Sequence, residues 1–363
     1  MAELKFPAMA GRMGDRTFYM TVMTLQMVGR FFQPTPDGIP AEQRAQRALN
    51  ERRVPEITDY LLEKESDWVF GSLTVSFDGE SSFGDGKTSP KAIDELRLDS
   101  DTEFVVVDGQ HRIAAIKRAI LDDPTLKAQQ IGVMLIPFES LDRNQQVFSD
   151  LNRTVQKTSR SLDILYDHDD PLNGLVKAVA TRVPLFHDRV EKNATSLAVR
   201  SRQFVTLSSL YDACRQLLGG ATAVDILKKD EEAANAAEEF CVSYWKALSD
   251  LIEPWRLVRD GEMKPSEARI DYIVAHAVAF FALGAAGAQI LGVQGKSDWD
   301  SEHDFSLLKP LHDIDWSKTN LGWQGIAMLG ASVVTRHQTR QALSRRICHL
   351  VDPARFEDAP PVL

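Results

Sequence analysis

The sequence predicts an α+β protein with a mixed α/β domain over residues 1–165, a mainly helical domain over 166–351 and a loose C-terminal tail over 352–363. In the first half of the chain, short apolar runs of strand character alternate with helical segments. After about Leu162, strand signals become sparse and helical patterns dominate. A chain of 363 residues is also long enough to form two hydrophobic cores.

The strand candidates all lie in the first half of the chain. Residues 17–32 are rich in aromatic and β-favouring side chains, and residues 71–77 alternate apolar with small polar side chains. Residues 104–107 and 131–137 are strongly apolar runs, and 96–98 is a shorter candidate. Helical patterns mark these other segments: 41–64, 140–155, 170–181, 206–219, 222–252, 266–293 and 321–350.

The composition is that of an ordinary soluble globular protein, with 44% hydrophobic and 26% charged residues. The formal net charge of −10 argues against a protein that coats nucleic acid nonspecifically, but it does not exclude DNA binding through a local basic patch. The three cysteines are far apart and show no zinc-binding spacing, so we expect no metal site. The N-terminus also lacks an apolar segment of signal-peptide length. Together with the scattered cysteines, this predicts a cytoplasmic location.

One apolar segment, residues 270–293, has the length of a membrane span. Asp271, His276 and Gln289 interrupt it, and its other residues are rich in alanine and glycine. Small residues allow a helix to pack closely against its neighbours. We therefore expect a buried core helix with His276 as a core histidine, and no membrane partner.

The most informative stretch is FVVVDGQHRIAAIKRA, residues 104–119. A strand that stops at a glycine turn before a helix presents backbone N–H groups and the positive end of the helix dipole, and both favour an anion. Gly109 would allow close approach of a phosphate, and Arg112 would offer it a planar charged fork. The sequence therefore predicts a phosphate or nucleotide site at the turn, formed by Asp108, Gly109, Gln110, His111 and Arg112.

The same residues have a ligand-free interpretation, which stays open at this point. In it, Asp108 caps the helix and Arg112 bridges to a nearby acid. In the phosphate interpretation, His111 would donate a hydrogen bond or shuttle a proton, and Asp108 would hold Mg²⁺ or orient Arg112.

The motif DGQHR at 108–112 comes with further segments in a fixed order. On these residues the chain resembles the DGQHR-domain proteins, and among them the DndB family of DNA sulfur (phosphorothioate) modification systems. The resemblance implies a transcriptional regulator, chiefly a repressor, that binds the promoter of the phosphorothioation gene cluster and does not catalyse the sulfur chemistry. The matching segments are GRMGDRTFYMTVM, QRALNERRVPEITDYLLE, WVFGSLTVSF, VFSDLNRTVQKTSRSLDILYD and LHDIDWSKTNLGWQG.

A more distant resemblance is to the ParB/sulfiredoxin-like fold. ParB proteins carry Gly-x-Arg-Arg where this chain has the residues from Gly109 to Arg112, and a later Glu-Asn-x-x-Arg that is similar to the segment around Asn152 and Arg153. The resemblance implies a nucleotide pocket that adds Asn152 and Arg153 to the turn, with ATP or CTP and Mg²⁺ as the cofactor. Gln110 replaces the sulfiredoxin cysteine, so no thiol chemistry carries over. A nucleotide-binding or nucleotide-hydrolysing protein that acts on DNA is therefore the alternative function, although no Walker A lysine motif is present.

Basic side chains outside the turn are candidates for contact with double-stranded DNA at the promoter. A plain charged surface, or pairing with acids of the same chain, is the competing interpretation. Regulators that read palindromic promoters are commonly symmetric dimers, so we expect a homo-oligomer and further contacts with other modification-system proteins. The DNA-contact candidates are Arg44, Arg47, Arg52, Arg53, Lys157, Arg160, Arg200, Arg202, Arg336 and Arg340.

Overall fold

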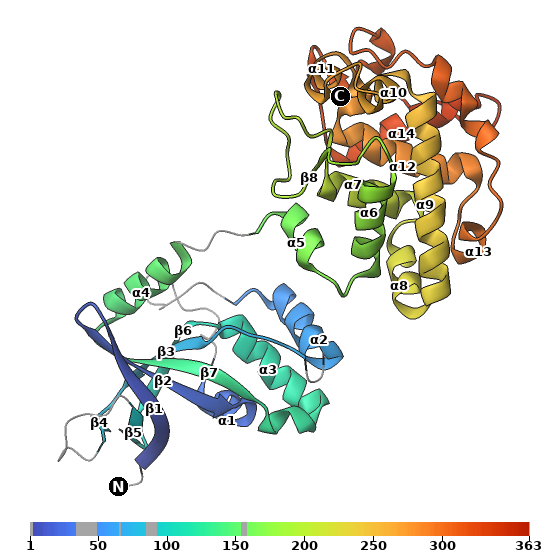
Figure 1. Ribbon diagram of the computed structural model, residues 1–363. Helices are drawn as coiled ribbons and strands as arrows, with labels where there is room; N and C mark the ends of the chain where they lie inside the picture. Colours follow the sequence, from blue (N-terminus) through green and yellow to red (C-terminus); the bar gives the residue numbers. More distant parts are fainter. Residues whose placement is uncertain (1–2, 34–48, 65–66, 85–92, 154–157, 363) are drawn as a thin grey trace. The chain divides into compact units, whose positions relative to one another are not determined.

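The chain folds into two compact units, Met1–Gln156 and Lys157–Leu363. The first is built around a β-sheet and the second is mainly helical, which confirms the α+β class. The division falls after Gln156 and not after residue 165, so residues 158–165 belong to the helical unit. The computed structural model describes residues 3–33, 49–64, 67–84, 93–153 and 158–362 (Figure 1).

The first unit contains a seven-stranded sheet in the order β4-β5-β1-β2-β7-β3-β6. Neighbouring strands in it are antiparallel, except that β3 and β7 run parallel. Its strands are β1 Glu3–Met13, β2 Arg16–Thr24, β3 Leu73–Asp78, β4 Ser81–Phe83, β5 Ile93–Asp99, β6 Glu103–Asp108 and β7 Gln130–Pro137. Its helices are α1 Leu25–Phe31, α2 Val54–Lys64, α3 Gln110–Asp122 and α4 Leu141–Arg153, with the 3-10 turns η2 Glu51–Arg53 and η3 Pro124–Ala128.

The sheet buries side chains on both faces, because successive residues of a strand point to opposite sides. On one face, Val106 of β6 and Leu135 of β7 join the larger core, which α1, α2 and α3 complete. The next residues along the same strands, Val107 and Ile136, form a smaller cluster with Val147 of α4. Figure 1 accordingly shows α3 and α4 on opposite sides of the sheet.

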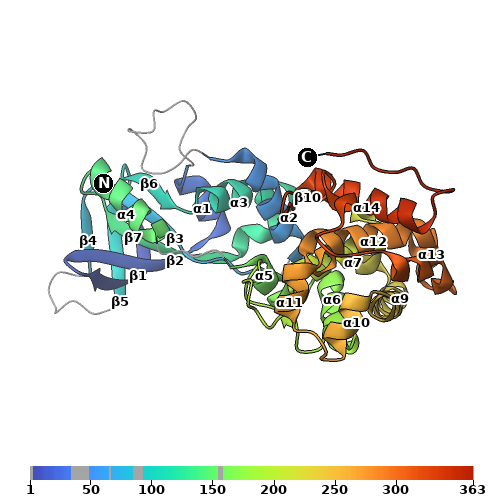
Figure 2. The same cartoon turned by 90° about the horizontal axis from the view of Figure 1, so that it is seen from above.

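The second unit packs its helices around the alanine- and glycine-rich α12. Figure 2 shows α12 next to α7 and α14, and both pairs are in contact. The helices are α5 Arg160–Tyr166, α6 Pro171–Arg182, α7 Leu207–Leu217, α8 Ala221–Lys229, α9 Glu231–Leu251, α10 Glu253–Arg259, α11 Pro265–Asp271, α12 Ala277–Leu291, α13 Lys296–Trp299 and α14 His337–Val351. The shorter elements are β8 Val190–Glu191, β9 Val205–Thr206, β10 Met328–Leu329, β11 Ser332–Val333 and the 3-10 turns η4 Ile273–Ala275, η5 Phe305–Asp313 and η6 Leu321–Trp323.

The small residues of α12 allow its neighbours to approach very closely. A Cβ atom at Gly284 would lie 2.2 Å from the carbonyl oxygen of Ala213 in α7. Larger side chains of α12 fill the remaining space, and Phe280 stacks on Trp255 of α10 with ring centroids 5.0 Å apart. The helix therefore combines a close backbone contact with aromatic packing at the centre of the unit.

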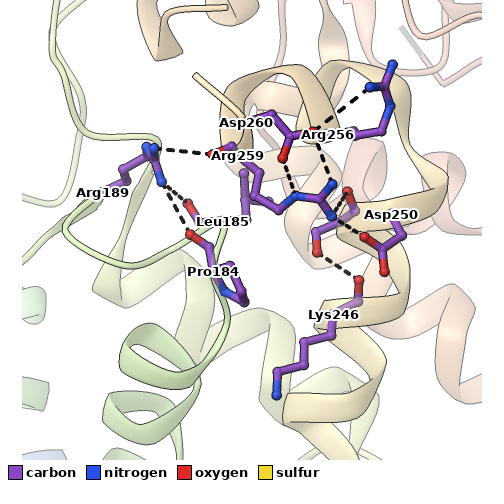
Figure 3. A network of polar contacts seen from close by, with 9 residues as sticks. Pro184, Leu185, Arg189, Lys246, Asp250, Arg256, Arg259 and Asp260 are labelled. Atoms are coloured by element: carbon purple, nitrogen blue, oxygen red, sulfur yellow. Dashed lines mark hydrogen bonds and ion pairs between the residues drawn. The ribbon is translucent and has the colours of Figure 1, made fainter. Parts of the chain in front are cut away.

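A polar network joins the end of α9 to α10 and to the loop after α6 (Figure 3). Arg259 donates to Oδ1 of Asp260 at 2.8 Å and also contacts Asp250. The Arg259 guanidinium holds the pKa of Asp260 below its usual value. Arg189 donates to the carbonyl oxygens of Pro184, at 3.3 Å, and of Arg259, at 3.5 Å. The loop is thereby anchored to the C-terminal end of α10.

Several expected segments differ from the observed elements. The strand expected over 17–32 ends at Thr24, whose side chain accepts a hydrogen bond from the Met27 N–H and caps α1. The helix expected over 266–293 is interrupted, because Tyr272 is extended and forms a β-bridge with Ser317. The helix expected over 321–350 begins at His337, after the hairpin of β10 and β11. Within the described part of the chain, no helix is both long and apolar enough to cross a membrane.

The C-terminal segment packs against other parts of the second unit, whereas the sequence predicts a loose tail from residue 352. Asp358 accepts a hydrogen bond from Nε of Arg346 at 2.5 Å. The guanidinium of Arg355 donates to the carbonyl oxygens of Gln289 and Ile290 at the end of α12. These are polar contacts with distant segments, which explains why the composition of the tail did not reveal them.

The close contact at Gly284 predicts a sharp contrast between two glycine-to-alanine substitutions. Gly284→Ala should lower the free energy of unfolding by about 2–3 kcal/mol, because the new methyl group must displace the backbone of α7. The new Cβ atom of Gly174→Ala in α6 would have no atom within 4 Å. This substitution should therefore raise the free energy of unfolding by roughly 0.5–1 kcal/mol. Urea unfolding followed by tryptophan fluorescence measures both. Equal midpoints for the two variants would show that α7 and α12 are not in close contact.

Candidate nucleic-acid interface

The turn after β6 has the geometry that requires its glycine. Asp108 ends the strand, Gly109 adopts a left-handed φ of +106°, and α3 begins at Gln110. A Cβ atom at position 109 would lie 2.5 Å from the Cδ2 atom of Leu73. Both the backbone angle and the approach of Leu73 therefore favour glycine at this position.

The guanidinium of Arg112 is engaged by groups of its own unit. Its Nη2 atom donates to Oδ2 of Asp108 at 2.7 Å, and its Nη1 atom donates to the carbonyl oxygens of Ser72, at 3.3 Å, and of Gly71. Only 20% of the Arg112 side chain is exposed. This is the bridge to a nearby acid that the ligand-free interpretation describes. It fastens the start of α3 to the segment that precedes β3.

His111 connects the turn to a part of the chain far away in sequence. Its Nε2 atom accepts a hydrogen bond from the backbone N–H of Asn50 at 2.9 Å. Burial and the charge of Arg53 lower the pKa of His111, and Asp108 opposes them with a smaller effect. The imidazole is therefore neutral near pH 7, with its proton on Nδ1, as an acceptor at Nε2 requires.

The hydrogen bond from Asn50 places η2 beside the start of α3. Arg52 and Arg53 in η2 are both exposed. The side chain of Asn50 fixes the turn by accepting from the Arg52 N–H at 3.2 Å. We call Arg52, Arg53 and His111 the N-terminal basic patch. The sequence placed these residues in two separate candidate sites, and the fold brings them together.

The remaining candidates of the first unit are Gln110, Asn152, Arg153 and the basic residues Arg44 and Arg47. Gln110 is buried. Asn152 and Arg153 end α4, and their side chains are outside the described residues, so their convergence on the turn stays a prediction. Arg44, Arg47 and Lys157 also lie outside the described residues.

Two of the candidates in the second unit converge on one carboxylate. Arg160 binds Asp212 through both terminal nitrogens, at 3.0 and 2.6 Å. Arg340 approaches the same carboxylate at 3.5 Å and lies over the ring of Phe281. Sequence reasoning missed Asp212, because nothing in the sequence near either arginine points to it. Arg160 and Arg340 are thus partly neutralised within the unit.

The other basic candidates of the second unit are exposed: Arg200, Arg202 and Arg336. Arg336 takes the N-cap position of α14, where its backbone N–H donates to Oγ1 of Thr339 at 2.8 Å. Since Arg340 turns toward Asp212, it does not present a free charge beside Arg336.

The contacts of Arg112 predict that it stabilises the fold of the first unit. Arg112→Ala should lower the free energy of unfolding by about 1–2 kcal/mol, because Asp108 and two carbonyl groups lose their donor. Arg118→Ala, at an exposed position of the same helix, is the matched control and should stay within about 0.5 kcal/mol of the unchanged protein. Hydrogen exchange of peptides from β3 and α3 reports on this unit. If Arg112→Ala and Arg118→Ala have the same free energy of unfolding, the Arg112 side chain does not stabilise this unit.

The described residues contain no group of three or more histidine, cysteine, aspartate or glutamate side chains that could hold a metal ion. No curated protein and no solved structure matches the chain. A sequence model of the DndB family, described as DNA-sulfur modification-associated, matches residues 6–352. This match covers both units and extends through α14. The chain therefore belongs to the DndB family of DNA-sulfur modification-associated proteins.

Proposed function

We propose that this protein is a cytoplasmic DNA-binding repressor of a phosphorothioate modification gene cluster. Its family is associated with DNA sulfur modification, which supports a role in such a system. The observation that carries the DNA-binding part of the proposal is the N-terminal basic patch. There, the short turn that carries two adjacent exposed arginines is held beside the start of α3.

The position of Arg52 and Arg53 disfavours a purely structural role for them. Both lie immediately before α2, and the hydrogen bond between Asn50 and His111 brings them to the start of α3 as well. The N-terminal end of a helix carries partial positive charge, so cations placed there are unfavourable for the fold. Among the described residues, no carboxylate forms an ion pair with either arginine. An external anion would therefore be attracted to this patch.

The phosphates of DNA are the anions that we propose for this patch. Two neighbouring exposed arginines can contact successive phosphates of one strand, and such contacts position a protein on the duplex. Arg112 is engaged with Asp108, so the proposal assigns the phosphate contacts to Arg52 and Arg53, and a positioning role to Arg112. Sequence preference would come from further contacts, for which the exposed Arg200, Arg202 and Arg336 are candidates.

Assembly and partners are part of the same proposal. A repressor of a palindromic promoter would act as a homodimer, because the symmetry of the protein then matches that of the operator. It would also meet other proteins of the modification system at the same gene cluster.

The test compares the double variant Arg52→Gln/Arg53→Gln with the unchanged protein in fluorescence anisotropy with the cluster promoter. The slope of log K against log salt should become shallower by about 2, because each lost phosphate contact removes roughly 0.9. Affinity should fall at least about tenfold, and by a similar factor for random DNA, since phosphate contacts are not specific for sequence. The matched control is Lys228→Gln/Lys229→Gln, which removes two adjacent exposed charges from the end of α8.

Two results would contradict the proposal in different ways. Equal retention of promoter and random DNA by the unchanged protein would remove the repressor role. An unaltered salt slope in the arginine variant, or an equal loss in the lysine variant, would remove the N-terminal basic patch as the DNA contact.

A further inference from the structure

The second unit contains a cavity that the proposed function does not use. It has a volume of about 730 Å³, which lies in the range of small-molecule sites. Its walls come from the starts of α7, α12 and α14, the segment around residues 195–199, and Lys318. All of these residues belong to one unit, so the cavity is defined by that unit alone.

The cavity carries an excess of positive charge. Its lining includes one carboxylate, Asp212, and four cationic side chains: Arg160, Arg269, Lys318 and Arg340. Asp212 pairs with Arg160 and Arg340, and its single negative charge offsets only one of the four positive charges. The lining therefore has a surplus of three positive charges. The chain as a whole has a net charge of −10, so this surplus is a local feature and not a reflection of composition.

Arg269 is the most deeply buried of the four cations, with 7% of its surface exposed. Its guanidinium donates to the carbonyl oxygens of Val199, at 3.3 Å, and of Ser201 and Gln203. Within the described chain no carboxylate pairs with it. A buried cation that meets only carbonyl dipoles keeps its full charge, and an anion nearby lowers the cost of burying it.

Lys318 lies next to Arg269 in the cavity wall. Its ammonium group donates to the carbonyl oxygen of Arg269 at 2.6 Å, and Nε2 of His276 lies 2.9 Å from the same oxygen. Burial lowers the pKa of Lys318, and Asp271 opposes this only in part. Burial and the charge of Lys318 also lower the pKa of His276 to about 4, so His276 is a neutral donor here. Arg269 and Lys318 therefore form a cationic pair without an acid partner in direct contact among the described residues.

The rest of the lining is apolar or carries hydroxyl groups. Phe204 and Phe280 are fully buried in the wall. Val199 and Ile270, also in the lining, are 66% and 56% exposed. Exposed aliphatic side chains lie beside two cations that have no acid partner in direct contact among the described residues. This combination suits a ligand that has both a negatively charged group and an apolar body.

We infer that this cavity binds a small organic phosphate, with its phosphate group against Arg269 and Lys318 and its organic body against the apolar wall. A phosphate monoester carries close to two negative charges, so it offsets more of the surplus than a single carboxylate would. Guanidinium and ammonium groups together provide the donors that phosphate oxygens accept. The other cations, Arg160 and Arg340, are a weaker choice, because Asp212 competes for them.

Isothermal titration calorimetry of the full chain tests this inference, with AMP, ATP and glucose 6-phosphate as organic probes and pyrophosphate as the inorganic reference. At least one organic phosphate should bind, and more tightly than pyrophosphate, because the apolar wall contributes. Lys318→Gln should weaken that binding at least about tenfold, since it removes a charge-assisted hydrogen bond. Lys309→Gln removes an exposed charge outside the cavity and should change the affinity less than about twofold.

Lys318→Gln also loses a contact with the Arg269 carbonyl, so its circular dichroism and thermal midpoint must match the unchanged protein. If they do not, Arg340→Gln is the second variant, and it should weaken binding less than tenfold because Asp212 already occupies Arg340. The inference fails if no organic phosphate binds, if pyrophosphate binds as tightly, or if a folded Lys318→Gln binds normally.

The DNA-binding proposal is tested separately from this site. The variant Arg52→Gln/Arg53→Gln should bind the organic phosphate with unchanged affinity, because its substitutions lie in the other unit. Competition with duplex DNA provides the remaining control. If DNA displaces the small ligand, the cavity is part of a DNA surface and the inference is wrong.

Discussion

The hydrogen bond from the Asn50 N–H to Nε2 of His111 is the constraint on which the N-terminal basic patch depends. It joins two segments that are 61 residues apart, and it places η2 against the first turn of α3. An acceptor at Nε2 exists only while the imidazole is neutral. Burial and the positive charge of Arg53 both favour that neutral form. The same arginine that we propose as a DNA contact therefore helps to maintain the hydrogen bond that positions it.

The residues of the DGQHR motif mainly hold this arrangement in place, and they expose few groups that could bind a ligand. Gly109 provides the left-handed turn and admits Leu73. Arg112 joins Asp108 to the segment before β3, and His111 holds η2. In this view the motif is a positioning device, and the exposed charge comes from Arg52 and Arg53. Arg52 and Arg53 thus lie beside the motif in the fold, although they are distant from it in the sequence.

The sequence predicts local structure well where a signal is local. The apolar run at 104–107, Gly109 and the helical pattern after it define β6, the turn and α3 as observed. Contacts between distant segments leave no such signal. The sharing of Asp212 by Arg160 and Arg340, and the break of the expected 266–293 helix at Tyr272, depend on residues far away in the chain. The family was predicted from short motifs in a fixed order, and the match over residues 6–352 confirms it.

The charge distribution gives the two units different chemistry within an acidic chain. The first unit holds exposed arginines near two helix starts, whereas the second places one buried cation, Arg269, and three more accessible ones around a cavity. The central claim, that His111 positions the arginines, is tested most directly by the promoter affinity of His111→Leu. We predict a loss of affinity even though Arg52 and Arg53 are intact, because η2 is no longer held beside α3. An affinity equal to that of the unchanged protein, in a variant that is folded, would contradict the account.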